Sequence, residues 1–265
     1  MKVARLYFGG AYTTSTLKIL HQKPDKTRTD YFSPGCVAGF IVIQDGSNVF
    51  TYLPSLDVWE KKPASEAVSP EALRPDLVKN FDIRLIGSAV VAGRSAYVIL
   101  ATPHNPDETA RRLWIDEASY LVIGMQVEDP RGTIVNSSHY TSIELNPTDI
   151  GPDAFRITGK VRDVPKPARV EFESLVPKYL PSGYRLYVST SITVNGASCA
   201  HMQFSNGSNV ISLFERRGED AIDRSPVPHK SNVTSVLTWS RDGIVFTLIG
   251  DVAHKELVKI ADSMR

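Results

Sequence analysis

The fold is decided by four consecutive segments: GRSAYVIL at Gly93–Leu100, RLWID at Arg112–Asp116, LVIGMQVEDPRG at Leu121–Gly132 and HYTSIEL at His139–Leu145. Each segment is short and apolar enough for a strand, and turn residues separate them. The turn at 129–132 has Pro130 in its second position and Gly132 in its fourth, as a tight turn requires. The pattern predicts four antiparallel strands in a meander. Such a curved sheet has a hollow side that needs a cover.

Composition excludes several classes of function. The chain has 265 residues, ordinary apolar and charged fractions and a formal net charge of +1. This charge gives no field that would gather nucleic acid or an anionic membrane. No segment has the roughly 18 uninterrupted apolar residues of a membrane span, so we expect no transmembrane segment. The two cysteines, Cys36 and Cys199, are expected to be free thiols, because they lie in separate predicted domains.

The distribution of prolines and glycines predicts two domains. Residues 146–169 are polar and rich in Pro and Gly, which is typical of a linker. We therefore predict a first domain at 1–150, a linker at 151–169 and a small second domain at 170–265. The second domain reads as strands at 184–194, 198–204, 209–215, 234–240 and 243–250. It ends in an amphipathic helix with Leu257, Ile260, Ala261 and Met264 on one side.

The first domain also contains shorter strand candidates, at 3–8, 16–22, 37–43, 48–53 and 83–87. Between residues 55 and 81 the sequence changes to prolines, paired lysines and acids. This segment is the candidate for a helix or lid over the sheet, with Ser69 as a helix cap and Pro70 in the first turn.

No pattern of catalytic residues emerges. The six histidines are scattered singly, and Cys199-Ala-His201 supplies only two of the ligands that a zinc site needs. The acid pairs Asp116-Glu117 and Glu128-Asp129 fall in turns, where carboxylates accept local backbone hydrogen bonds. There is no activated-serine elbow and no glycine-rich phosphate loop. We predict a protein that is not an enzyme and has no cofactor and no metal site.

A resemblance connects these segments. The ordered motifs resemble those of the LolA-like lipoprotein-binding fold, and in particular of the MucB/RseB family of sigma-factor regulators: Gly93–Ile99, Arg112–Asp116, Asp129–Gly132 and Thr141–Ile143. Three later motifs are similar to the small C-terminal domain of that family: Tyr179–Tyr184, His201–Gly207 and Val210–Glu215.

The resemblance implies a mainly β protein of the α+β class. Its first part would be a LolA-like curved antiparallel half-barrel with covering helices, and its second a small α+β domain ending in a helix. It implies an extracytoplasmic protein, in the periplasm or at the outer face of the cytoplasmic membrane. The signal peptide and N-terminal helix expected of the family are not seen in this chain. The implied partners are the extracytoplasmic segment of an anti-sigma factor and a lipid or acylated lipoprotein, in envelope stress signalling.

The residues expected to line the lipid cavity come from the alternation of the strands. Leu121, Ile123, Met125 and Val127 share one face, the preceding strand adds Leu113 and Ile115, and Trp59 lies at the start of the candidate lid. Ordinary core packing is the alternative for each of them. For the whole chain, the alternatives are a LolA-like lipoprotein or lipid carrier and a hydrolase whose active site forms only on folding.

Overall fold

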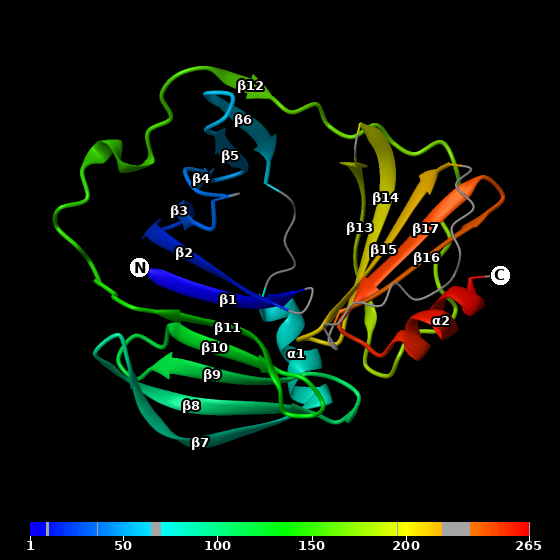
Figure 1. Ribbon diagram of the computed structural model, residues 1–265, viewed down its shortest axis with the longest axis horizontal. Coiled ribbons are helices and arrows are strands. Elements are labelled where there is room, and N and C mark those ends of the chain that lie inside the picture. The colour runs from blue at the N-terminus through cyan, green and yellow to red at the C-terminus, as the bar shows by residue number, and fades with distance from the viewer. Residues whose placement is uncertain (9–10, 36, 65–69, 195, 219–233, 265) are drawn as a thin grey trace.

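The computed structural model describes residues 1–8, 11–35, 37–64, 70–194, 196–218 and 234–264, and these form two β-sheets (Figure 1). Sheet A has twelve strands in the order β12-β6-β5-β4-β3-β2-β1-β11-β10-β9-β8-β7, and sheet B has five in the order β13-β14-β15-β17-β16. The predicted mainly β, α+β class is confirmed. Cys36 and the cap residue Ser69 lie outside the described residues.

Sheet A is built from the first two thirds of the chain. Its strands are β1 (Lys2–Phe8), β2 (Ala11–Gln22), β3 (Lys26–Ser33), β4 (Ile41–Asp45), β5 (Asn48–Leu53), β6 (Val58–Pro63), β7 (Phe81–Val91), β8 (Arg94–Pro103), β9 (Ala110–Asp116), β10 (Val122–Glu128), β11 (Ile134–Tyr140) and β12 (Val161–Asp163). Helix α1 (Pro70–Asn80) connects β6 to β7, and the 3-10 turn η1 (Pro152–Phe155) precedes β12. Figure 1 shows the sheet curling from β7 up to β6.

Sheet B contains β13 (Arg185–Val194), β14 (Ala197–Ser205), β15 (Val210–Arg217), β16 (Ser235–Arg241) and β17 (Ile244–Gly250), followed by α2 (His254–Ser263). The helix packs on β16 and β17. Leu257, Ile260, Ala261 and Met264 are all at most 4% exposed, as the amphipathic pattern predicted. Together with Phe204, Leu213 and Leu248 they form the core of this unit.

The meander predicted from the decisive segments is confirmed, because β8, β9, β10 and β11 are antiparallel neighbours in that order. The carboxylates in its turns have the structural role expected of them. Asp116 accepts the N–H of Ser119 at 2.8 Å and a bidentate contact from Arg94 at 2.7 and 2.9 Å. These contacts hold the pKa of Asp116 well below its usual range. Asp129 likewise accepts the N–H groups of Arg131 and Thr133.

Several details of the sequence prediction are wrong. The segment at 37–43 is a strand only from Ile41 onward, because the chain turns at Gly39, where φ is +83°. The segment after Tyr140 is not a strand. Strand β3 was not predicted, and β6 lies in the segment 55–81 that was predicted as a helix or lid. Sheet A is also not wholly antiparallel. The short β12, within the predicted linker, runs parallel to β6.

The linker at 151–169 is attached to sheet A, and the segment that follows it is attached to sheet B. It leaves β11, passes around the outside of sheet A and pairs with β6 through β12 before it reaches sheet B (Figure 1). Further on, the N–H of Leu175 donates to both oxygens of the Glu215 carboxylate, at 3.0 and 3.3 Å. Glu215 is 1% exposed, and burial raises its pKa to about 7 against the hydrogen bonds from Leu175 and Ser174.

The raised pKa of Glu215 predicts a pH dependence of stability. In the unfolded chain the carboxyl ionises near 4.5, but in the folded protein it ionises only near 7. Its contribution is therefore fully present below about pH 4.5, and up to about 3 kcal/mol is lost as the pH rises through 7. We expect Glu215→Gln to remove this slope, as measured by urea unfolding at pH 4.5, 6 and 8. The exposed Glu144→Gln is the control. Equal slopes in the wild type and Glu215→Gln would contradict the assignment.

Candidate functional site

One side of strands β7–β10 is apolar, and the strand register defines it. Met125 lies opposite Leu113, which lies opposite Ile99, which lies opposite Leu85. Residues directly opposite each other on neighbouring strands point to the same side, as do residues two apart on one strand. The apolar face therefore comprises Ile83, Leu85, Tyr97, Ile99, Ala101, Leu113, Ile115, Ile123, Met125 and Val127.

The apolar face is covered at one end and open toward the other. At the covered end, Phe81, Ala101 and Val127 are at most 5% exposed. Further along the sheet, Leu85 is 63% and Tyr97 36% exposed. An apolar surface that is left open next to a buried one is typical of a binding surface.

The structure brings together five of the seven predicted cavity residues on this face: Leu113, Ile115, Ile123, Met125 and Val127. Leu121 precedes β10 and is 49% exposed, and the register is interrupted between it and Gly124. Trp59 lies elsewhere, on β6, seven strands away from β10. It is 5% exposed, and its indole N–H donates to the carbonyl of Thr158 at 2.8 Å. In this structure Trp59 holds the linker.

The covered end of the apolar face meets a hairpin loop from sheet B. Glu108, just before β9, is 4% exposed and accepts hydrogen bonds from the side-chain amides of Asn206, Asn209 and Asn105. Asn206 and Asn209 belong to the turn between β14 and β15 and are 1% and 0% exposed. Burial raises the pKa of Glu108, and the three amides oppose that rise. A buried carboxylate thus joins the two sheets.

A second set of contacts comes from β9 itself. The Arg111 guanidinium donates to the carbonyl of Ser208 at 2.8 Å and to the side-chain oxygen of Asn209 at 3.2 Å. The Thr109 hydroxyl donates to the same Asn209 oxygen at 2.9 Å. Arg111 lies opposite Val127 and Ala101, so its stem belongs to the apolar face. The loop at 205–209 is therefore attached to the covered end of that face.

Helix α1 packs against the same loop. The Asn80 amide donates to the carbonyl of Asn206 at 2.8 Å. Gly207 has φ +101°, and a Cβ there would lie 2.3 Å from the backbone nitrogen of Leu77. Only glycine allows this approach of loop and helix. Around the contact lie two ion pairs, Arg185 with Asp76 at 2.7 Å and Lys255 with Asp107 at 2.6 Å.

Away from the junction, the described residues form no large cluster of titratable side chains. Across the described ranges, no group of three or more His, Cys, Asp or Glu side chains could hold a metal ion. Cys199 is 2% exposed, and the His201 ring stacks on Phe214 with centroids 4.4 Å apart. Burial lowers the pKa of His201. Neither helix of the described residues is long and apolar enough to cross a membrane.

Sequence reasoning missed the polar junction between the sheets. Asn206 and Gly207 enter the sequence analysis only as the end of the motif His201–Gly207, and Glu108 is not among the predicted residues. The contact between Asn206 and Glu108 joins residues 98 positions apart, and only the folded chain brings them together. In the sequence, only the turn with Asn206 and Asn209 around Gly207 could have indicated this junction.

The fold and the face define a mainly β protein of two joined sheets, with an apolar sheet surface that opens away from their junction. The chain belongs to the MucB/RseB family, because the model of the MucB/RseB N-terminal domain matches residues 11–168, more than half of its length.

Solved structures agree over the whole chain. A crystal structure of MucB in complex with MucA(peri) superposes with a TM-score of 0.69 at 18% identity, covering 100% of this chain and 91% of that one. The Pseudomonas aeruginosa MucA/MucB complex gives 0.66 at 16% identity, with 100% and 92% covered. A structure of MucB gives 0.65 at 17% identity, with 99% and 89% covered. At these identities the likeness shows the fold. A search of curated proteins found no match.

The approach of Gly207 to α1 yields a prediction for the junction. We expect Gly207→Ala to destabilise the protein by about 1–3 kcal/mol, because the methyl group clashes with the helix backbone. Gly159→Ala is the matched control. Its φ is +95°, but nothing lies within 4 Å of the added Cβ. Denaturant unfolding would measure both variants, and hydrogen exchange at 205–209 would locate the effect. An equal loss in both variants would mean that backbone strain alone, without the clash, explains it.

Proposed function

We propose that this protein is a non-enzymatic, extracytoplasmic regulator that binds the extracytoplasmic segment of an anti-sigma factor and senses lipid or acylated lipoprotein. Membership of the MucB/RseB family supports the regulatory part. MucB has been solved in complex with MucA(peri), and this chain shares its fold over its full length. That full-length agreement, across both sheets and their junction, carries the proposal of a protein partner.

The lipid part is supported by the apolar face. It offers adjacent aliphatic side chains on four strands, with Leu85 and Tyr97 open to solvent. Burying one leucine side chain contributes about 1.5–3 kcal/mol, so an acyl chain that contacts several of them gains enough to bind. Leu113, Ile115, Ile123, Met125 and Val127 are the predicted residues that we retain for this role. Trp59 and Leu121 lie apart from them, so we leave both out.

Leu85 allows a test that spares the core. We expect Leu85→Glu to weaken binding of a diacylated peptide about tenfold or more, because the charge would have to be buried under the acyl chain. Leu56→Glu is the matched control, since Leu56 is 57% exposed in the turn between β5 and β6. Native mass spectrometry with the diacylated peptide would measure the adducts. Equal adducts in all three proteins would contradict lipid binding on this face.

The same proteins distinguish a regulator from a carrier. The probe would be labelled MucA(peri), the segment solved in complex with MucB, and its binding would be followed by fluorescence anisotropy. A regulator binds the segment, and the diacylated peptide releases it. A lipoprotein or lipid carrier would bind the diacylated peptide and leave the segment free, and that result would replace our proposal.

A further inference from the structure

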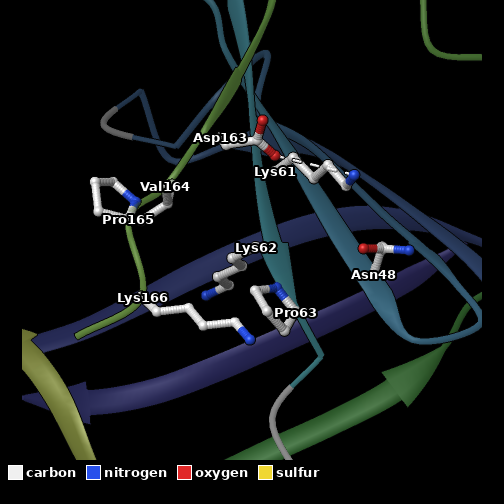
Figure 2. A pocket seen from close by; sticks show the side chains of 8 residues that line it. All are labelled: Asn48, Lys61, Lys62, Pro63, Asp163, Val164, Pro165 and Lys166. Carbon is white, nitrogen blue, oxygen red and sulfur yellow. Dashed lines mark ion pairs between the residues drawn. The ribbon is translucent and has the colours of Figure 1, made fainter. Parts of the chain in front are cut away.

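A groove lies near the β12 border of sheet A, between strands β5 and β6 and the linker (Figure 2). It has a volume of about 340 Å³ and is lined by Asn48, Lys61, Lys62, Pro63 and residues 163–166. The pairing of β12 with β6 builds it. The N–H of Val164 donates to the carbonyl of Lys61 at 2.7 Å. The N–H of Trp59 donates to the carbonyl of Lys160 at 2.9 Å. One wall therefore belongs to the sheet and the other to the linker.

The groove carries an excess of positive charge. Three lysines and one carboxylate line it, and Lys61 lies 3.9 Å from Asp163. Among the described residues, no ion pair or hydrogen bond engages the side chains of Lys62 and Lys166. Figure 2 shows their side chains reaching into the same part of the groove, beside Pro63. Two ammonium groups that approach one space repel each other, and an anion between them removes that repulsion.

The chemistry of the lining selects the kind of anion. Lysine is a compact point charge that binds phosphate oxygens without needing the planar fork of arginine. The Asn48 amide can donate to a further oxygen, and Pro63 and Pro165 provide apolar walls. The volume is at the lower end of the range for small-molecule sites, roughly 300–1,000 Å³. A phosphate group fits these conditions, whereas a polyanion would need a larger field than a protein with net charge +1 supplies.

We propose that this groove binds a phosphate group between Lys62 of β6 and Lys166 of the linker, with Asn48 as a further donor and Lys61 beside it. The bound phosphate joins the linker to the edge of sheet A. Asp163 opposes binding, because its carboxylate lines the same groove and is 84% exposed, only weakly paired with Lys61. The phosphate can belong to a soluble molecule or to a lipid headgroup. The proposal is independent of the function proposed above.

The first experiment titrates the full chain with inorganic phosphate at constant ionic strength, by calorimetry. We expect saturable binding that Lys62→Gln/Lys166→Gln weakens at least tenfold. Asp163→Asn should strengthen binding severalfold, because it removes a negative charge from the groove. Lys18→Gln/Lys23→Gln is the matched control, with the same change of net charge at exposed sites on and beside β2. Hydrogen exchange at 161–164 should slow when phosphate binds.

The second experiment identifies the source of the phosphate. Sedimentation with phosphatidic acid vesicles is compared with phosphatidylcholine vesicles for the same four proteins. If Lys62 and Lys166 are needed for binding to phosphatidic acid vesicles, the ligand is a lipid headgroup. If inorganic phosphate binds but the vesicles do not, the ligand is a soluble phosphate compound. The proposal fails if inorganic phosphate binds the wild type no better than Lys62→Gln/Lys166→Gln. It also fails if Lys18→Gln/Lys23→Gln loses as much affinity, because general charge would then explain the binding.

Discussion

The buried Glu108 carboxylate and the amide side chains around it fix how the two sheets meet. A carboxylate removed from water is costly unless its oxygens accept hydrogen bonds, and here Asn105, Asn206 and Asn209 donate them. Both ends of the Asn209 side-chain amide form hydrogen bonds, since its oxygen also accepts from Thr109 and Arg111. If the loop were displaced, several buried polar groups would lose their partners at once. Such a network contributes less to the net free energy of folding than to the selection of one arrangement of the two sheets.

The position of that network leaves the apolar face accessible. The loop at 205–209 covers only the end of the face where Arg111 and Val127 lie. The part around Leu85 and Tyr97 is not covered by sheet B, and α1 packs at the loop. Within the described part of the chain, the edge strand β7 has no neighbour on its outer side, so the open part of the face continues to the border of the sheet. A ligand on this face would therefore lie next to the junction without having to break it.

Most of the strands could be predicted from local patterns, and the missed features depend on distant contacts. Alternation and turn residues are sufficient for β8–β10, and the spacing of Leu257, Ile260 and Ala261 is sufficient for α2. Strand β11 ends at Tyr140 and begins at Ile134, ahead of the segment predicted at 139–145. Strand β3 has the sequence KTRTDYFS, whose polar residues hide a strand that pairs on both sides. Strand β12 has three exposed residues and is held by backbone hydrogen bonds. Trp59 was expected to line the cavity from the start of the candidate lid, but its indole N–H donates to the carbonyl of Thr158.

The linker gives the two sheets a second connection, at the opposite border of sheet A from the first. Strand β12 extends the sheet at β6, whereas Glu108 and Arg111 contact sheet B from the segment leading into β9 and from β9 itself. The segment after the linker is held where the N–H of Leu175 donates to the buried Glu215 of β15. Sheet B is thus attached to sheet A through side chains at one place and through the chain itself at another.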